Sequence, residues 1–288
     1  MIQETILFWY KKHKRDLPWR TTNNPYYIVV SEFMLQQTQV DRVIPKYHVF
    51  LKKFPTVQAL AAASPADVIN EWAGLGYYRR ALYLYKFAQA VVTQYNGTIP
   101  ENREQLMELP GIGPYTSQAI RCFGFHKDVP VIDINIKRIY SRVFFRGEGS
   151  ENELNNIARE LVPKAHGVAW NNALMDFGAT ICADRPKCDS CPLTAQCSAY
   201  KAGTPHKYLK PKTQSKFIGS NRFYRSLIIK ELRKNKNFTS TISAIKSIKP
   251  ANKTDAWLEV IIKSLEKDGL IIIKKETISL PLQQPSNT

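Results

Sequence analysis

The chain has 288 residues, 44% of them hydrophobic, and its 41 Lys and Arg against 24 Asp and Glu give a net charge of +17. This length allows two or three domains with a sizeable core, and the charge indicates a polyanionic partner, first of all nucleic acid. No run of about 18 apolar residues occurs, and residues 1–5 do not resemble the start of a secretion signal, so a membrane-spanning or secreted protein is not expected. We therefore expect a soluble monomer of the cytoplasm, associated with the nucleoid if the source is bacterial and making no membrane contact.

Residues 1–200 are predicted to be mostly α, because apolar residues recur at helical spacing and alternating patterns are nearly absent. The first helix is expected over residues 2–14, and residues 28–50 predict two helices separated at Pro45. Ser64 followed by Pro65 is a favourable start for another helix. Helices are expected over residues 64–73, 79–95, 103–108, 114–123, 134–144, 151–161 and 168–180.

Two glycine-rich stretches, Gly-Leu-Gly-Tyr-Tyr at 74–78 and Pro-Gly-Ile-Gly at 110–113, interrupt these helices. Glycines two residues apart allow a tight turn and expose backbone N–H groups that can bind a phosphate. A plain turn between helices is an equally good interpretation of Gly-x-Gly alone. The apolar helix before 110–113 and the Pro-initiated helix after it favour the phosphate-binding interpretation.

These blocks resemble one family of DNA repair enzymes. Residues 110–113 resemble the hairpin of the helix-hairpin-helix DNA glycosylases, and Val131-Ile132-Asp133 resembles the segment that carries their aspartate. Residues 16–20 (Asp-Leu-Pro-Trp-Arg), 31–40 and 74–78 resemble the adenine DNA glycosylase (MutY) group. The resemblance covers roughly residues 1–200. It implies a two-lobed, mostly α glycosylase fold and a monofunctional enzyme of base excision repair, which hydrolyses the N-glycosidic bond of a flipped, mismatched base in duplex DNA.

Hydrolysis of that bond requires protonation of the departing base and stabilisation of a cationic sugar, which calls for two carboxyl groups in opposite protonation states. Glu32 lies among apolar residues, where desolvation favours its neutral form, and the resemblance makes it the acid that protonates N7 of adenine. Asp133 lies at the head of a predicted helix, whose N–H groups favour its ionised form. It is therefore expected to stabilise the sugar cation and the approach of water.

Tyr115 stands where the related endonuclease III lyases have a lysine, so no Schiff base can form and a hydrolase without strong strand-cutting activity is expected. Asn135 matches a family asparagine that orders the aspartate. The family usually has glycine between the two, and this chain has Ile134. The glycines Gly111 and Gly113 are expected to contact the DNA backbone.

The resemblance also implies a set of residues that hold the opened base pair. Gln36 and Gln37 resemble the wedge that bonds the stranded partner base, and Tyr77 resembles the intercalating tyrosine. The remaining matches lie close to the flipped base: Trp19, Arg20 and Asn172. Asn172 departs from the family, which usually has Gln or Glu there to read the adenine edge.

Adenine opposite guanine or 8-oxoguanine is the substrate that these blocks favour, and two alternatives remain open. Thymine- or uracil-releasing mismatch glycosylases (T:G, U:G) share the hairpin, the tyrosine and the aspartate. A non-catalytic iron-sulfur protein that binds DNA is the second alternative, against which the presence of both Glu32 and Asp133 argues.

Four cysteines within residues 182–197 lie where the family has its [4Fe-4S] cluster: Cys182, Cys188, Cys191 and Cys197. Disulfides are disfavoured in a reducing compartment, and zinc is less favoured because only one Cys-x2-Cys knuckle is present. The first gap is one residue shorter than in the family. The cluster is expected to be structural, and Arg185 and Lys187 in its loop are expected to meet DNA phosphates. Cys122 is predicted to lie in the core.

The basic charge is concentrated in residues 201–288, with 18 Lys and Arg against six Asp and Glu. Residues 1–200 are predicted to form the glycosylase core, residues 201–220 a basic linker, and residues 221–288 a small α+β module resembling a winged helix. Its helices are expected over 221–234 and 255–267, with strands at 270–273 and 277–280 after an Asp-Gly turn. The family usually has a Nudix-like domain here that inspects 8-oxoguanine, so weaker discrimination for that base is expected.

Overall fold

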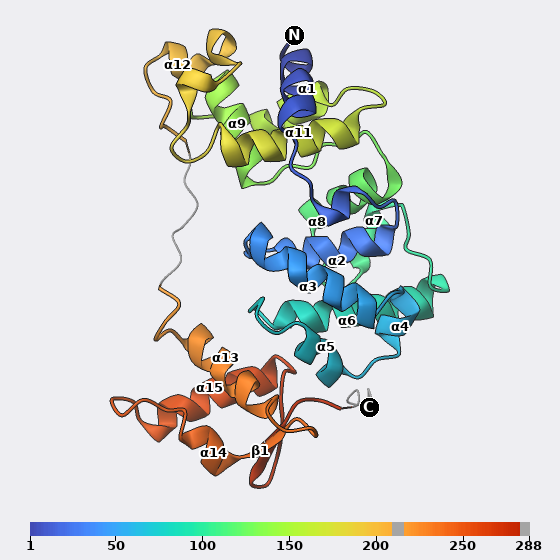
Figure 1. Ribbon diagram of the computed structural model, residues 1–288, viewed down its shortest axis with the longest axis vertical. Coiled ribbons are helices and arrows are strands. Elements are labelled where there is room, and N and C mark those ends of the chain that lie inside the picture. Colours follow the sequence, from blue (N-terminus) through green and yellow to red (C-terminus); the bar gives the residue numbers. More distant parts are fainter. Residues whose placement is uncertain (209–215, 283–288) are drawn as a thin grey trace. The chain divides into compact units, whose positions relative to one another are not determined.

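The structure is a computed structural model, and it describes residues 1–208 and 216–282 (Figure 1). The middle of the predicted linker and the last six residues of the predicted C-terminal module lie outside the described residues. Contacts divide the chain into two compact units, each built from segments distant in the sequence. The first comprises Met1–Ile28, Glu101–Met107 and Ile112–Thr213, and the second comprises Val29–Pro100, Glu108–Gly111 and Gln214–Thr288.

The first unit is helical, which confirms a mostly α fold for this part of the chain. Its elements are α1 (Ile2–His13), η1 (Pro18–Arg20), α8 (Pro114–Ala119), the π-helical turn η2 (Ile120–Gly124), α9 (Ile134–Phe145), α10 (Glu151–Leu161), α11 (Gly167–Thr180), η3 (Cys188–Ser190), η4 (Thr194–Gln196) and α12 (Ser198–Lys201). Helices α2 (Pro25–Leu35) and α7 (Arg103–Glu108) carry the chain between the units.

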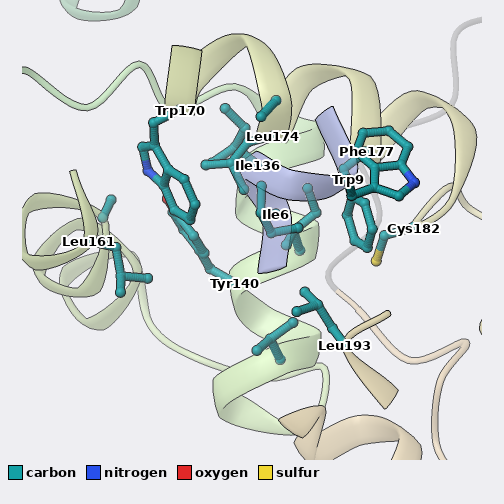
Figure 2. Packing of buried hydrophobic residues seen from close by; sticks show 14 of the residues in the cluster. Ile6, Trp9, Ile136, Tyr140, Leu161, Trp170, Leu174, Phe177, Cys182 and Leu193 are labelled. Atoms are coloured by element: carbon teal, nitrogen blue, oxygen red, sulfur yellow. The ribbon is translucent and has the colours of Figure 1, made fainter. Parts of the chain in front are cut away.

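The core of the first unit joins α1, α9, α10 and α11 to the cysteine loop (Figure 2). Helix α1 contributes Ile6 and Trp9 from one face, and Trp9 meets Phe177 of α11 edge-on with ring centroids 5.2 Å apart. Cys182 and Leu193 of the cysteine loop belong to the same cluster. Because these two residues are buried with the helices, the loop is packed onto the unit by hydrophobic contact as well as by any metal it holds.

The second unit contains α3 (Val40–Lys53), α4 (Val57–Ala61), α5 (Pro65–Glu71) and α6 (Arg79–Tyr95), followed by the C-terminal elements. Ser64 caps α5 as predicted, its side chain accepting the Asp67 N–H, with Pro65 in the first turn. The predicted break at Pro45 is wrong, because Pro45 lies inside α3 and the break falls between Leu35 and Val40. Pro45 removes only the N–H that would bond the Asp41 carbonyl, and α3 continues through it.

The C-terminal residues form a small helical and β-sheet region. Its elements are α13 (Asn221–Leu232), β1 (Thr239–Thr241), α14 (Ile242–Lys246), α15 (Asp255–Lys267), β2 (Ile272–Lys274) and β3 (Thr277–Ser279). All pairs are antiparallel in the order β1-β3-β2, and Ser279 lies opposite both Thr239 and Ile272. Both expected helices and the hairpin are present, whereas β1 was not predicted. Three residues are too few for an alternating pattern to stand out.

A search of the described residues for membrane-spanning helices found none of sufficient length and apolar character.

Candidate functional site

Asp133 is fixed at the start of α9 by two hydrogen bonds to its carboxylate. One oxygen accepts the backbone N–H of Ile136 at 2.7 Å, so the residue is the N-cap of the helix. The other oxygen accepts the side-chain amide of Asn135, also at 2.7 Å. The sequence placed both residues correctly at the head of a helix. Ile134, which departs from the family glycine, is 43% exposed and so takes no space in this arrangement.

Arg138 in turn fixes Asn135, and this link was missed by the sequence analysis. Its guanidinium donates to the Asn135 side-chain oxygen at 2.9 Å, to the Gly178 carbonyl at 2.7 Å and to the Cys182 carbonyl at 2.8 Å. A Cβ on Gly178 would lie 2.9 Å from Asn135 Cβ, so glycine is needed for this close approach. The amide that holds the catalytic candidate is thus itself immobilised.

Helix α11 contains both Asn172 and Asp176, and Asp176 is a fully buried carboxylate that Arg20 contacts. Arg20 makes two hydrogen bonds to Asp176, at 2.8 and 2.9 Å, and Arg15 adds a third at 2.6 Å. Burial alone would raise the pKa of Asp176, but these arginines outweigh it and hold the pKa below its usual value. An acid in the apolar run Ala-Leu-Met-Asp-Phe was the signal that a cationic partner had to lie nearby.

Arg20, Trp19 and Asn172, predicted near the flipped base, differ in how they are engaged. Trp19 is 8% exposed. Arg20 is held by Asp176, yet its buried Nε has no acceptor within the described part of the chain. Asn172 is also 8% exposed, and its amide has no hydrogen-bond partner among the described residues. Its amide is not among the fully enclosed polar atoms and so keeps access to solvent, which makes Asn172 a candidate for a ligand contact.

Tyr115 lies in the first turn of α8 and packs, half-buried, against the cluster of Ala119, Cys122 and Val131. Cys122 is fully buried there, as predicted. Gly113 is the N-cap of α8. Gly111 has φ +80°, and a Cβ there would lie 2.7 Å from the Phe33 ring, so a side chain is excluded. The hairpin therefore requires glycine at this position for both conformation and space.

In the second unit, Glu32 is buried in α2 with 7% of its surface exposed. Gln36 and Gln37 follow the end of this helix, and Gln37 is exposed with a left-handed φ of +56°. Tyr77 in the other glycine-rich stretch is also exposed and left-handed, with φ +47°. Two polar or aromatic side chains are thus presented to solvent from turns whose backbone conformation is uncommon for residues other than glycine.

Arg80 connects these two turns, and the sequence analysis did not single it out. It is 7% exposed and donates to the carbonyls of Phe33 and Met34 at 2.9 Å and to that of Gln36 at the end of α2. It also donates to the carbonyls of Leu75 and Gly76, both at 3.1 Å. Desolvation by burial lowers the pKa of Arg80 to about 10. The carbonyls of Phe33 and Met34, in the last turn of α2, have no N–H partner within the helix, and the guanidinium takes that place. It also joins the end of α2 to the glycine-rich turn.

The four predicted metal ligands line one hollow of the first unit: Cys182, Cys188, Cys191 and Cys197. Among the described residues no three potential ligands stand in a ready metal-binding arrangement. The thiols are nevertheless close enough to raise one another's pKa, after the larger effect of burial, which brings the pKa of Cys191 to about 11. Arg142 Nη1 lies 3.5 Å from Cys182 Sγ. Four converging thiols beside a buried cation suit a group that binds as thiolates.

Arg185 and Lys187 are exposed in the cysteine loop, where side chains remain accessible to a polyanion. The loop between Cys182 and Cys188 is held from within, since Arg142 donates to the carbonyls of Ala183 and Asp184 at 2.5 and 3.0 Å. The shortened gap between Cys182 and Cys188 therefore wraps around the Arg142 side chain, which bonds its backbone carbonyls.

Comparisons with known proteins agree with this arrangement. A profile of the HhH-GPD superfamily of base excision DNA repair proteins matches residues 30–164. An adenine DNA glycosylase of Mycolicibacterium smegmatis is 38% identical over 233 residues, 79% of this chain and 79% of the relative. That of Buchnera aphidicola is 33% identical over 289 residues, 96% of this chain and 82% of the relative. Among solved structures, a thermostable thymine-DNA glycosylase has a TM-score of 0.67 at 32% identity, covering 70% of this chain and 95% of that one.

The helical fold, the glycine hairpin and the superfamily profile define a DNA N-glycosylase of base excision repair. Tyr115 in place of a lysine is consistent with a hydrolase of this class. Within the class, the chain belongs to the adenine DNA glycosylase family, as the identity and coverage of these relatives require.

Proposed function

We propose that this protein hydrolyses the N-glycosidic bond of adenine mispaired with guanine or 8-oxoguanine in double-stranded DNA. The observation that carries the proposal is the Asp133 carboxylate, fixed by Ile136 N–H and by Asn135, on a chain whose relatives are adenine glycosylases. A carboxylate held by two donors stays oriented without rearranging during the reaction, as electrostatic stabilisation of a cation requires.

In the proposed mechanism the two carboxyl groups have opposite tasks. Glu32 is buried, and burial favours a neutral carboxyl that can give its proton to the departing base. The base leaves with the bonding electrons, and the sugar carries positive charge. Asp133 stabilises that charge and accepts a proton from the water that attacks the sugar. Tyr115 has no amine, so it forms no Schiff base with the sugar and the strand stays intact.

The remaining residues are assigned to two roles by where they lie: some fill the space left by the flipped base, and others bind that base or the DNA backbone. Gln37 and Tyr77 are exposed on turns that Arg80 joins, which supports insertion beside the stranded base. The amide of Asn172, which has no hydrogen-bond partner among the described residues and keeps access to solvent, supplies hydrogen bonds for the flipped base. Gly111 and Gly113 hold the DNA backbone at the hairpin, together with Arg185 and Lys187 of the cysteine loop.

A [4Fe-4S] cluster is the cofactor that we propose for the four cysteines. Their convergence on one hollow supports it, and the cluster when bound supplies four iron–thiolate links that fasten residues 182–197. The test is the colour and metal content of the purified protein and of a Cys197→Ser variant. We expect a brown protein with four irons and a pale variant of lower thermal stability. A colourless protein with stoichiometric zinc would contradict the assignment.

Thymine or uracil opposite guanine is the second candidate substrate, supported by the 32% identity to a thymine-DNA glycosylase and by Asn172 in place of the family Gln or Glu. A panel of duplexes, each with one A:G, A:8-oxoG, A:C, T:G or U:G pair, separates the candidates. We expect base release from A:G and A:8-oxoG. Release from T:G alone would favour the second candidate, and release from no duplex would favour a non-catalytic DNA-binding protein.

For residues 216–282 we propose a winged-helix-like module. The order helix, strand, helix, helix and hairpin, with sheet order β1-β3-β2, supports this architecture.

A further inference from the structure

Three consecutive residues of loop 74–79 each contact a different residue of the C-terminal region within the second unit. Arg222 of α13 donates to the Tyr77 hydroxyl at 2.5 Å. Burial raises the pKa of the Tyr78 hydroxyl, and the nearby charge of Arg233 opposes this shift. Asp268, after α15, lies 3.5 Å from Arg79 Nε. Because successive side chains are each engaged, the loop is held along its length and not at a single point.

Tyr77 lies within reach of two guanidinium groups from different parts of the unit. That of Arg80 is 5.6 Å from the ring centroid and that of Arg222 is 5.8 Å from it. Both distances are in the range in which a cation is attracted to an aromatic ring. Arg80 holds the loop by donating to backbone carbonyls such as that of Gly76. Of the two arginines, Arg222 is the one that donates to the Tyr77 hydroxyl. The orientation of this exposed ring is therefore set partly by the C-terminal region.

Further contacts fasten the C-terminal region at the same place. Arg233 Nε donates to Asn70 at 2.8 Å, and the Pro281 carbonyl accepts the Ala66 N–H at 2.9 Å. Asp268 is itself held by Arg225 of α13. These contacts join the C-terminal region to α5, the helix that precedes the loop. They fix the position of α13, and therefore of Arg222, beside the loop.

The helix that a winged-helix module would place in a DNA groove is poorly suited to that task here. The exposed positions of α15 carry three acids, Asp255, Glu259 and Glu266, against Lys263 and Lys267. Acids near phosphates repel, so such a face contributes little to backbone binding. Of the two arginines of α13, Arg222 bonds Tyr77 of loop 74–79, whereas Arg225 bonds Ser264 and Asp268 at the end of α15.

We infer that Arg222 is a positioning residue for Tyr77, and that the C-terminal region supports the intercalating loop instead of reading DNA through α15. The inference rests on the proposed function, because it assumes that Tyr77 enters the duplex. Holding the ring in the inserted orientation before DNA arrives lowers the ordering cost of insertion. The hydroxyl of Tyr77 accepts the hydrogen bond from Arg222, while its ring stacks beside the base.

The test measures binding to two duplexes, one intact and one with a tetrahydrofuran abasic analogue, which is uncuttable and independent of the base that the enzyme releases. The proteins are wild type, Tyr77→Phe, Arg222→Ala, the double variant and Lys230→Ala. Tyr77→Phe keeps the ring and removes the hydroxyl that accepts from Arg222. Lys230 is an exposed cation on the same helix that bonds no other residue within 1–208 and 216–282, and it controls for loss of one charge.

We expect Tyr77→Phe and Arg222→Ala each to lower the preference for the abasic duplex about tenfold, as loss of a charged hydrogen bond implies. The double variant should match the single ones, since both remove the same interaction. Lys230→Ala should leave the preference unchanged. The inference would be overturned if the effects of the two single variants multiplied in the double variant, or if Arg222→Ala had no effect. It would also be overturned if Arg222→Ala weakened binding to both duplexes equally, which would mark a phosphate contact. A wild type without any preference for the abasic duplex would instead contradict the proposed function on which the inference rests.

Discussion

At the scale of single residues, Asp133 allows chemistry and folding to be separated. Asparagine caps helices as well as aspartate does, so Asp133→Asn should keep the bond to Ile136 N–H and leave thermal unfolding nearly unchanged. It cannot offer the negative charge that the sugar cation needs, so we expect single-turnover base release to fall at least about a thousandfold. Unfolding of the variant at a markedly lower temperature would show that the carboxylate is needed for the fold, and its activity loss would then carry no mechanistic meaning.

Arg80 supports a second prediction at this scale. Lysine at position 80 keeps the charge but loses the planar fork that reaches carbonyls on both turns, so Arg80→Lys leaves buried acceptors unsatisfied. We expect a loss of about 3 kcal/mol in the free energy of unfolding. Arg79→Lys, at the neighbouring exposed position, is the matched control and should cost less than about 1 kcal/mol. Equal losses in denaturant titrations would contradict the structural role of Arg80.

The residues proposed for the chemistry could be named from the sequence, whereas the residues that hold them could not. Asp133, Asn135 and Tyr115 stand in short motifs whose chemistry is legible without a fold. Arg80 and Arg138 look like ordinary helix charges in the sequence, because their acceptors are backbone carbonyls more than 40 residues away in some cases. Carbonyls are present at every residue, so no side-chain pattern marks a position as the acceptor of a buried arginine.

At the scale of elements, Asp176 links α11 to the segment before α2 and makes stability depend on pH. Its pKa is lowered in the folded state, so its contribution is present above the unfolded pKa and is lost as the pH falls. Asp176→Asn should cost about 3 kcal/mol near pH 7, because it leaves Arg15 and Arg20 without their carboxylate. The difference from wild type should shrink below about pH 4, the ordinary range for Asp. A difference that stays constant from pH 7 to pH 3 would contradict this.

Element boundaries followed from local rules where the deciding contacts were local. The Ser64 cap with Pro65 fixed the start of α5 as predicted. The end of α2 did not follow from such rules, because Arg80 supplies partners to the terminal carbonyls, and Pro45 was misread as the break instead. A helix end that is satisfied by a distant side chain needs no capping residue of its own. Its position is therefore invisible in the nearby sequence.

At the scale of the whole molecule, each compact unit is assembled from segments far apart in the chain, and this grouping was not predicted. The sequence favoured consecutive domains because charge and composition change near residue 200. The contacts of Arg222 with Tyr77 and of Arg233 with Asn70 join residues 145 and 163 positions apart. Their arginines are indistinguishable in the sequence from the solvent-exposed charges of the same basic region.

The role of the C-terminal region leads to a prediction about damaged guanine. The Nudix-like domain implied by the family resemblance inspects 8-oxoguanine, whereas the described C-terminal elements here make contacts to loop 74–79. Each hydrogen bond to the damaged base that the described C-terminal elements do not supply should cost about 1 kcal/mol, or about fivefold in the ratio of rates for A:8-oxoG over A:G. We therefore expect a smaller ratio in single-turnover release than for a relative with the Nudix-like domain assayed in parallel. An equal ratio would mean that residues of the glycosylase core themselves recognise the damaged base.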